Sequence, residues 1–150
     1  MTTSYRQAVG RKVVSRATAN QLGTLSHLLL TADCRQVVAV IVGKGKKARF
    51  IDWSALTGFG ADAIMASDEA ALRPPADSRE EAAAAGKLDV LGRRTLSESG
   101  NELGKIDDVA FDPADGAVAS LDIAGHQLPA DTVMGSGSYA VVVSASQDPL

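Results

Sequence analysis

One stretch of the sequence occurs twice, and this repetition limits the folds that the chain can adopt. Val9–Lys12 matches Leu91–Arg94, and Leu22–Leu25 matches Leu103–Ile106. The matches keep their order and lie about 81 residues apart early in the repeat and about 77 apart later. The later matches pair Val37, Val40 and Val42 with Val118, Leu121 and Ile123, Ile51–Trp53 with Leu128–Ala130, Gly58 and Gly60 with Gly135 and Gly137, and Ala63–Ile64 with Ala140–Val141. Such a pattern indicates one structural unit present in two copies.

The repeated unit is predicted to be made of short strands. Gly104–Ile123 alternates apolar and polar residues on both sides of the turn Asp112–Gly116, in which proline, aspartate and glycine suit successive turn positions. In the first copy, Val37–Val42 is a β-branched run that indicates a strand. For Thr24–Thr31 a helix competes, but the glycine before it and the strand after it favour a second strand. Val9–Val14 is predicted to be the first strand, after a loose N-terminal end at residues 1–8.

These patterns predict a mainly all-β protein with two repeats and a linker. The first repeat spans residues 1–66, the linker 67–87 and the second repeat 88–150. Within the linker, Asp77 can cap a short helix that ends at Gly86, and a helix this short must pack on a repeat or connect the two. Each repeat has only about 58 residues, a size at which burial is marginal, so we expect the repeats to pack on each other or on a second chain as a homodimer.

The chain resembles the PRC-barrel family in a tandem form. The second repeat has the fuller pattern, whose parts are Gly92–Arg94, Leu103–Gly104, Asp112–Gly116, Leu128–Pro129 and Val133–Gly135. The first repeat departs from it twice, because Asp33–Gln36 replaces the Asp-Gly turn and Ile51–Trp53 lacks the proline. The resemblance implies that each repeat closes into a small antiparallel β-barrel. It also implies a non-catalytic protein-docking or scaffolding role without a cofactor, since related barrels in the photosynthetic reaction-centre H subunit and the ribosome maturation factor are docking modules.

The charge distribution suggests what the partner is. Residues 1–60 carry nine Lys and Arg against two acids, a formal charge of +7, and residues 61–150 carry six against sixteen, a charge of −10. The two halves either face each other, within the chain or between copies, or the basic half binds an anionic partner, which could be an acidic protein or RNA. Aromatic residues make up only 4% of the chain, which weakens a function in stacking single-stranded bases. The candidate anion-binding residues are Arg11, Lys12, Arg16, Lys44, Lys46, Lys47 and Arg49, of which three lie in the basic loop Gly43–Lys47.

Catalytic and metal-binding patterns are weak. His27 is expected in a strand and His126 in a loop, and each has a structural or solvated interpretation. Cys34 sits in a turn next to Arg35, where a reactive thiol competes with an incidental one. The acids at 107, 108, 112 and 115 lack the spacing of a calcium loop, and the turn explains the last two. The Gly-x-Gly pairs at 58–60 and 135–137 fit tight turns better than phosphate loops. We therefore expect neither an enzyme nor a metal site.

The expected location is the cytoplasm. A single cysteine excludes an internal disulfide, and the chain begins without a signal peptide. The longest wholly apolar run, Val37–Val42, is far shorter than the roughly 20 residues that a membrane-spanning helix needs.

Overall fold

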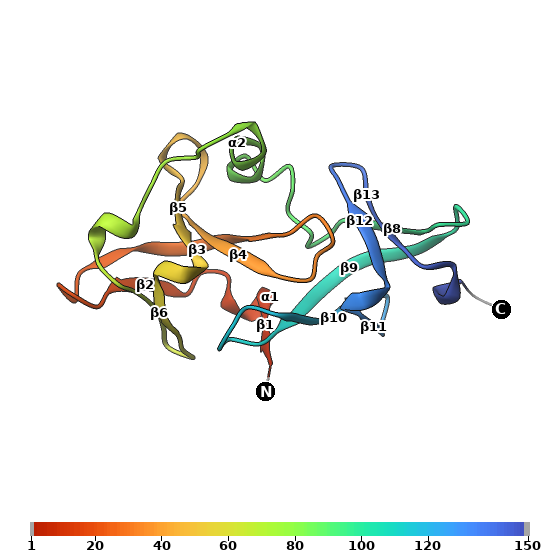
Figure 1. Ribbon diagram of the computed structural model, residues 1–150, viewed down its shortest axis with the longest axis horizontal. Coiled ribbons are helices and arrows are strands. Elements are labelled where there is room, and N and C mark those ends of the chain that lie inside the picture. Colours follow the sequence, from red (N-terminus) through yellow and green to blue (C-terminus); the bar gives the residue numbers. More distant parts are fainter. Residues whose placement is uncertain (1, 149–150) are drawn as a thin grey trace.

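Two β-sheets with the same strand order make up the computed structural model, which describes residues 2–148 (Figure 1). The first sheet runs β5-β4-β3-β2-β7-β6 and the second β11-β10-β9-β8-β13-β12. In each, one pair is parallel, β2 with β7 and β8 with β13, and the other pairs are antiparallel. The first unit comprises β2 (Lys12–Ser15), β3 (Gln21–Leu30), β4 (Val37–Val42), β5 (Arg49–Asp52), β6 (Leu56–Phe59) and β7 (Ala63–Ala66). The second unit comprises β8 (Arg94–Ser97), β9 (Glu102–Phe111), β10 (Val118–Ile123), β11 (His126–Pro129), β12 (Val133–Ser136) and β13 (Ala140–Val143).

The predicted mainly-β class is confirmed, and so are its most important strands. Strand β3 covers the segment for which a helix competed, and β9 and β10 flank the predicted turn. In that turn Asp112 Oδ1 accepts a hydrogen bond from the Ala114 N–H at 2.8 Å, and Gly116 has φ of 77°. The first strand begins later than predicted, at Lys12, and Gly58 ends up inside β6 rather than in a terminal turn.

The prediction of closed barrels is wrong, because each sheet is an open path of strands. Among the described residues, β5 does not pair with β6, nor β11 with β12. In the first unit the outer edge of β5 is occupied instead by the linker, where Phe50 and Arg73 exchange backbone hydrogen bonds of 2.8 and 2.9 Å. Strand β6 turns towards the second unit, where Phe59 lies 5.2 Å from Phe111 between ring centroids. In the first unit, other parts of the chain thus take the place that barrel closure would fill.

The Leu-Gly pair found in both repeats marks where the long strands β3 and β9 bend. Gly23 has φ of 146° and Gly104 of 130°, in the region that favours glycine. A Cβ atom on Gly23 would lie 2.5 Å from Cγ1 of Val42, and one on Gly104 would lie 3.1 Å from Cβ of Ala124. The bend lets the first half of each long strand pair with β2 or β8 while its second half pairs with β4 or β10.

The two units meet through equivalent residues. Gln36 forms an antiparallel bridge with Ala117, which lies 81 positions further on. The Val37 N–H donates to Gly116 O and the Val118 N–H donates to Arg35 O, both at 2.9 Å. Because each hydrogen bond is the counterpart of the other, the units are related by a local two-fold axis through the bridge, as in an isologous dimer.

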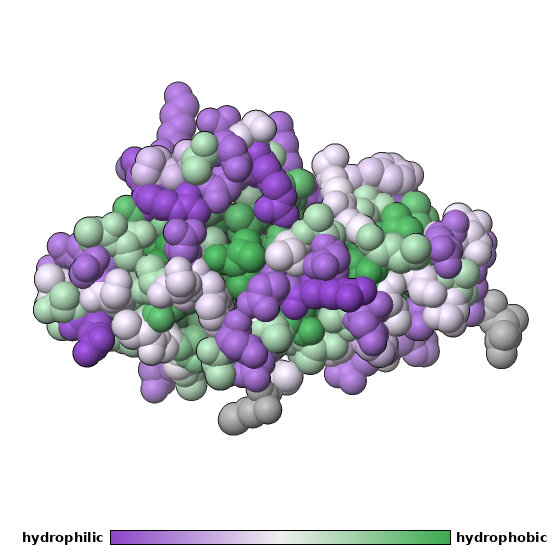
Figure 2. Space-filling model, viewed as in Figure 1, coloured by the Kyte–Doolittle hydropathy of each residue, from purple (hydrophilic) through white to green (hydrophobic). Residues whose placement is uncertain are grey.

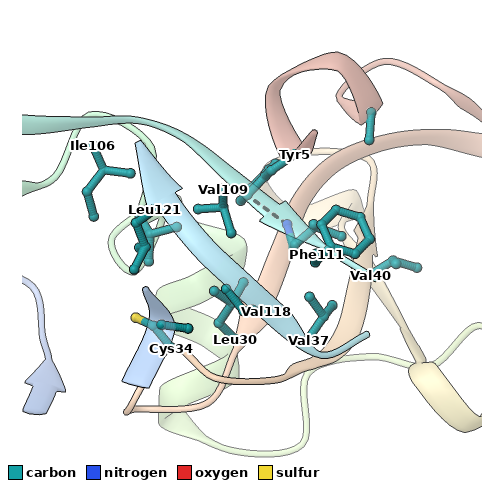
Figure 3. Close-up of a cluster of buried hydrophobic side chains, with 14 of the residues drawn as sticks. Tyr5, Leu30, Cys34, Val37, Val40, Ile106, Val109, Phe111, Val118 and Leu121 are labelled. Carbon is teal, nitrogen blue, oxygen red and sulfur yellow. Dashed lines mark hydrogen bonds between the residues drawn. The ribbon is translucent and has the colours of Figure 1, made fainter. Parts of the chain in front are cut away.

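A single cluster of buried apolar side chains extends through both units (Figure 3). It includes Val40 of β4, Phe111 of β9 and Leu121 of β10, all of which are fully buried. The ring of Trp53 stacks on Phe59 at 5.7 Å between centroids and meets the edge of Phe111 at 6.3 Å. The junction between the units is therefore part of the core, and burial of this area contributes much of the stability that a unit of this size lacks alone.

Residues 3–8 form regular structure, contrary to the prediction of a loose end over residues 1–8, of which residue 1 lies outside the described part of the chain. Thr3–Ser4 (β1) pairs with β9, and Tyr5–Ala8 (α1) forms one helical turn whose N-cap is Ser4. Tyr5 is fully buried in the shared cluster, and Arg6 Nε donates to Asp107 O at 2.8 Å. The N-terminal residues therefore tie the first unit to β9 of the second.

The predicted linker helix is confirmed as Ser78–Ala84 (α2). Asp77 Oδ1 accepts from the Glu80 N–H at 2.8 Å, as an N-cap should. Helix α2 lies over the outer face of β3, β4 and β5 (Figure 1), where Ala83 contacts a small apolar cluster that includes Ile41 and Phe50. At the equivalent positions the second unit has Asp122 and Gln127, so its outer face is polar. The N-terminal segment with Ser4 and Gln7 lies beside this face, where the first unit has α2.

Candidate functional site

The predicted basic loop, Gly43–Lys47, connects β4 to β5 and contains a 3₁₀ turn at Gly45–Lys47. Lys44, Lys46 and Lys47 are all exposed. The Gly43 N–H donates to Thr24 O at 3.3 Å, and Thr24 is the register partner of Lys12 in β2. The three lysines and Lys12 therefore stand at the same end of the first sheet.

The loop owes its shape to an arginine and two glycines. Arg49 Nη1 donates to Lys46 O at 3.2 Å and to Ala48 O at 2.9 Å, which fixes the second half of the loop. Gly43 and Gly45 have φ of 80° and 61°, and a Cβ on Gly43 would come within 3.3 Å of Lys47 O. The guanidinium of Arg49 is thus engaged with backbone carbonyls, whereas the lysine ammonium groups extend into solvent.

The ion pairs of the structure leave these lysines out. Among residues 2–148, Arg73 pairs with Asp52 at 2.8 Å and with Glu80 at 2.6 Å, and Arg94 pairs with Glu102 at 2.8 Å. The pair that crosses between β3 and the start of the second unit is His27 with Asp89. The basic and acidic halves of the chain therefore do not neutralise each other through the basic loop.

A groove of about 480 Å³ runs between the basic loop and α2. Its walls are mostly short apolar side chains, with one cation and one acid at its rim: Ala48, Pro75, Ala84, Ala85, Lys46 and Glu81. Figure 2 shows mainly hydrophilic side chains over the upper part of this unit, around α2 and the loop. The groove thus offers apolar contact next to positive charge.

Two of the seven predicted residues lie away from this surface. Arg11 Nη1 donates to Gly60 O at 2.8 Å, and its guanidinium stands 5.6 Å from the Phe59 ring centroid. Its counterpart Arg93 donates to Ser138 O in the same way, which explains why both repeats carry the arginine. Arg16 follows β2 at the opposite end from Lys12, and its N–H donates to Ala66 O at 2.8 Å. Arg11 is therefore structural, and Arg16 is remote from the basic loop.

A partly buried polar network that the sequence did not reveal joins the two units. The Tyr5 hydroxyl donates to Asp89 Oδ1 at 2.9 Å and accepts from the Leu28 N–H at 2.9 Å. The other oxygen of Asp89 lies 3.0 Å from Nδ1 of His27, and the Leu91 N–H donates to Oδ1 at 3.1 Å. Nothing in the pattern around Tyr5 distinguishes it except an aromatic ring in a polar segment, since its partners lie 23 and 84 residues away.

Burial and hydrogen bonding shift the pKa values in this network in opposite directions. Burial, aided by the charge of Asp89, raises the pKa of Tyr5, so the hydroxyl remains protonated. Burial also acts to raise the pKa of Asp89, but the hydrogen bonds from His27, Leu91 and Tyr5 outweigh it and hold that pKa below its usual value. The Asp89 carboxylate thus holds together Tyr5 of α1, His27 of β3 and the start of the second unit.

Cys34 is a buried junction residue and not a reactive thiol. It is fully buried in the turn between β3 and β4, with φ of 58°, and burial raises its pKa. Around it the turn contacts the second unit: Ser136 Oγ donates to Ala32 O at 2.8 Å and Arg35 Nη2 donates to Asp131 O at 3.1 Å. The thiol is therefore packed inside the contact between the units.

The remaining candidate residues have separate structural positions. His126, which was predicted to lie in a loop, is the exposed first residue of β11. Asp112 and Asp115 accept backbone N–H groups of their own turn at 2.8 and 2.9 Å, as the turn pattern predicted. Within residues 2–148 there is no group of three His, Cys, Asp or Glu residues placed to hold a metal ion.

Comparisons with family models and with curated protein sequences found no match to this chain. No helix among residues 2–148 combines the length and the apolar character needed to cross a lipid bilayer.

Proposed function

We propose that the protein is a non-catalytic docking module, made of a duplicated unit with a sequence pattern similar to that of the PRC-barrel family, which binds an acidic segment of a partner protein. The observation that carries this proposal is the position of three exposed, unpaired lysines beside an apolar groove. Charged groups at the rim of such a surface steer association, and apolar walls contribute the affinity.

The partner proposed is an acidic peptide segment that also carries small apolar side chains. Its carboxylates would lie against Lys44, Lys46 and Lys47, and its apolar side chains would lie along Ala48 and Ala84. RNA is the second candidate, because lysines also bind phosphates. Single-stranded RNA is normally held by stacking on aromatic rings as well, and the groove is lined by alanine and proline while Trp53 and Phe59 pack at the contact with the second unit.

The test compares two labelled probes by fluorescence anisotropy. One is a decapeptide of alternating aspartate and leucine, and the other is a single-stranded RNA of ten nucleotides. In the variant Lys46→Ala/Lys47→Ala we expect peptide affinity to fall about fivefold, since exposed ion pairs contribute about 0.5 kcal/mol each. Affinity for the unmodified protein should also fall as salt is added.

The control variant is Lys87→Ala/Lys105→Ala, which removes the same charge from exposed sites outside the groove. It should bind the peptide like the unmodified protein. Equal weakening in both variants would contradict a local site. Binding of RNA but not of peptide, lost only in the Lys46/Lys47 variant, would assign the same surface to nucleic acid. A further variant, Ala85→Glu, adds an acid to the groove and should weaken binding of the peptide.

A further inference from the structure

The outer edges of the two sheets are equivalent, yet only one of them is covered. In the first unit the edge strand β5 is met by the linker at Arg73, whose N–H and C=O exchange hydrogen bonds with Phe50 at 2.9 and 2.8 Å. Gln127 of β11 occupies the position of Phe50, because Phe50 stands opposite Ile41 while Gln127 stands opposite the equivalent Asp122. Among residues 2–148, Gln127 has no such backbone partner.

The hairpin geometry fixes which groups Gln127 presents outward. A two-residue turn, Ala124–Gly125, joins β10 to β11, and both turn residues have positive φ, of 51° and 85°, as a tight hairpin requires. Ile123 and His126 close this turn, so the next pair, Asp122 with Gln127, is the one that does not exchange backbone hydrogen bonds. The N–H and C=O of Gln127 therefore point away from the sheet, as those of Phe50 do.

Hollows flank this edge on both faces of the sheet. On the outer face, about 220 Å³ is lined by polar side chains that include Ser4, Asp108, Asp122 and Gln127. On the inner face, about 510 Å³ is lined by residues that include Leu103, Ile123 and Leu128. Side chains of an added strand alternate between the two faces, so one face would receive polar residues and the other apolar ones.

The charge around the edge selects the polar residues. Residues 88–150 carry ten acids and three Lys or Arg, a formal charge of −7. Asp108 and Asp122 are direct cross-strand partners. Asp108 accepts hydrogen bonds from Ser4 Oγ and from the Arg6 N–H, the latter at 2.9 Å. Asp122, on the strand next to β11, is therefore the acid that a cation from a partner would meet. Arg73 shows a similar arrangement on the first unit, where its guanidinium lies 2.8 Å from Asp52 of β5, the strand it pairs with.

We infer that the free edge of β11 binds an extended basic segment of another protein by strand addition. The residue opposite Gln127 is a lysine or arginine that faces Asp122, and its neighbours are apolar and face Leu103 and Leu128. Pro129, two residues after Gln127, has no N–H, so the free edge ends there. The added strand can therefore form a ladder about as short as the one between the linker and β5. The site is separate from the groove on the first unit.

The probe for this site is a labelled decapeptide of alternating lysine and valine, titrated against the full chain by fluorescence anisotropy. Its controls are an alternating glutamate–valine peptide and a lysine–valine peptide with alternate backbone nitrogens methylated, which cannot add to a strand. Only the unmethylated basic peptide should bind. Comparable binding of either control peptide, or no binding of the basic peptide, would overturn the proposal.

Two variants locate the binding. Gln127→Pro removes the outward N–H at an edge position where proline is tolerated, and it should lower the affinity for the basic peptide about tenfold. Asp122→Lys should also weaken it, whereas Asp131→Lys, the same charge change at an exposed site near β12, should weaken it less. Equal affinity for Gln127→Pro and the unmodified chain would refute the assignment. So would self-association of the protein that Gln127→Pro abolishes, because a second copy would then be the occupant.

Discussion

Gln36 and Ala117 occupy the same place in the two units, and they are paired with each other in an antiparallel bridge. The bridge is reinforced by Gln36 Nε2, which donates to Asp115 O at 2.6 Å. Two copies of one unit thus meet as the subunits of a symmetric dimer do, but within a single chain. The arrangement places the basic loop on one unit and the open polar edge on the other, so both remain accessible.

The glycine next to this bridge should tolerate no side chain. A Cβ on Gly116 would lie 2.8 Å from Gln36 Nε2 and 3.0 Å from Trp53 Cε2, and φ is 77°. We expect Gly116→Ala to lower the free energy of unfolding by about 3 kcal/mol, measured by urea denaturation. Gly125→Ala is the control, because φ is 85° there but no atom lies within 4 Å of the added Cβ. A loss at Gly116 no larger than at Gly125 would contradict the close approach.

The Tyr5 hydroxyl should matter for stability although Tyr5 lines neither of the proposed binding surfaces. Tyr5→Phe leaves the buried Leu28 N–H without an acceptor and removes one of the donors to Asp89 Oδ1, which should cost about 1–3 kcal/mol in unfolding free energy. Tyr139→Phe removes the same hydroxyl from a side chain that is 68% exposed, and should change stability by less than about 0.5 kcal/mol. Similar values for the two variants would show that the network does not hold the units together.

Asp89 should make stability depend on pH in the acid range. Its pKa is lower in the folded protein than in the unfolded chain, so its contribution is complete above the unfolded value of about 4 and is lost as pH falls through the folded value. Asp89→Asn should therefore be less stable than the unmodified protein at pH 7, and the difference should shrink below about pH 4. Thermal unfolding across this range measures it. A difference that stays constant with pH would contradict the assignment.

Cys34 should react slowly with thiol reagents while the protein is folded. The side chain is fully buried at the contact between the units, and burial raises its pKa, so little thiolate is present. Labelling by a maleimide should accelerate only when urea unfolds the chain. Rapid labelling without urea would mean that the contact between the units opens readily.

Local patterns were enough to predict much of the fold. The alternation in β9 and β10, the turn at Asp112–Gly116 and the cap at Asp77 all depend on residues close in sequence, and the structure has each of them. Local patterns could not show that the sheets stay open rather than close into barrels. Whether β5 pairs with another strand or with Arg73 depends on where the linker runs, and the alternation of β5 is the same in both cases.

The candidate site was predicted only in part for a similar reason. The basic loop was visible because its lysines are adjacent in sequence, but the groove beside it requires α2 to lie next to Ala48. Arg11 belonged to the same set by charge, and only the structure shows that its guanidinium is used by Gly60 and Phe59. Tyr5 and Asp89 act across 84 residues, a separation that no local pattern can bridge.

The most direct test of the account is amide hydrogen exchange, followed by NMR, at Val37 and Val118. Both N–H groups donate across the contact between the units at 2.9 Å. If the two units form one body through this contact, both amides should be protected to the same order as those of Val40 and Leu121 in the shared core. Exchange as fast as at the exposed turn residue Ala124 would contradict the pairing on which the arrangement of both binding surfaces depends.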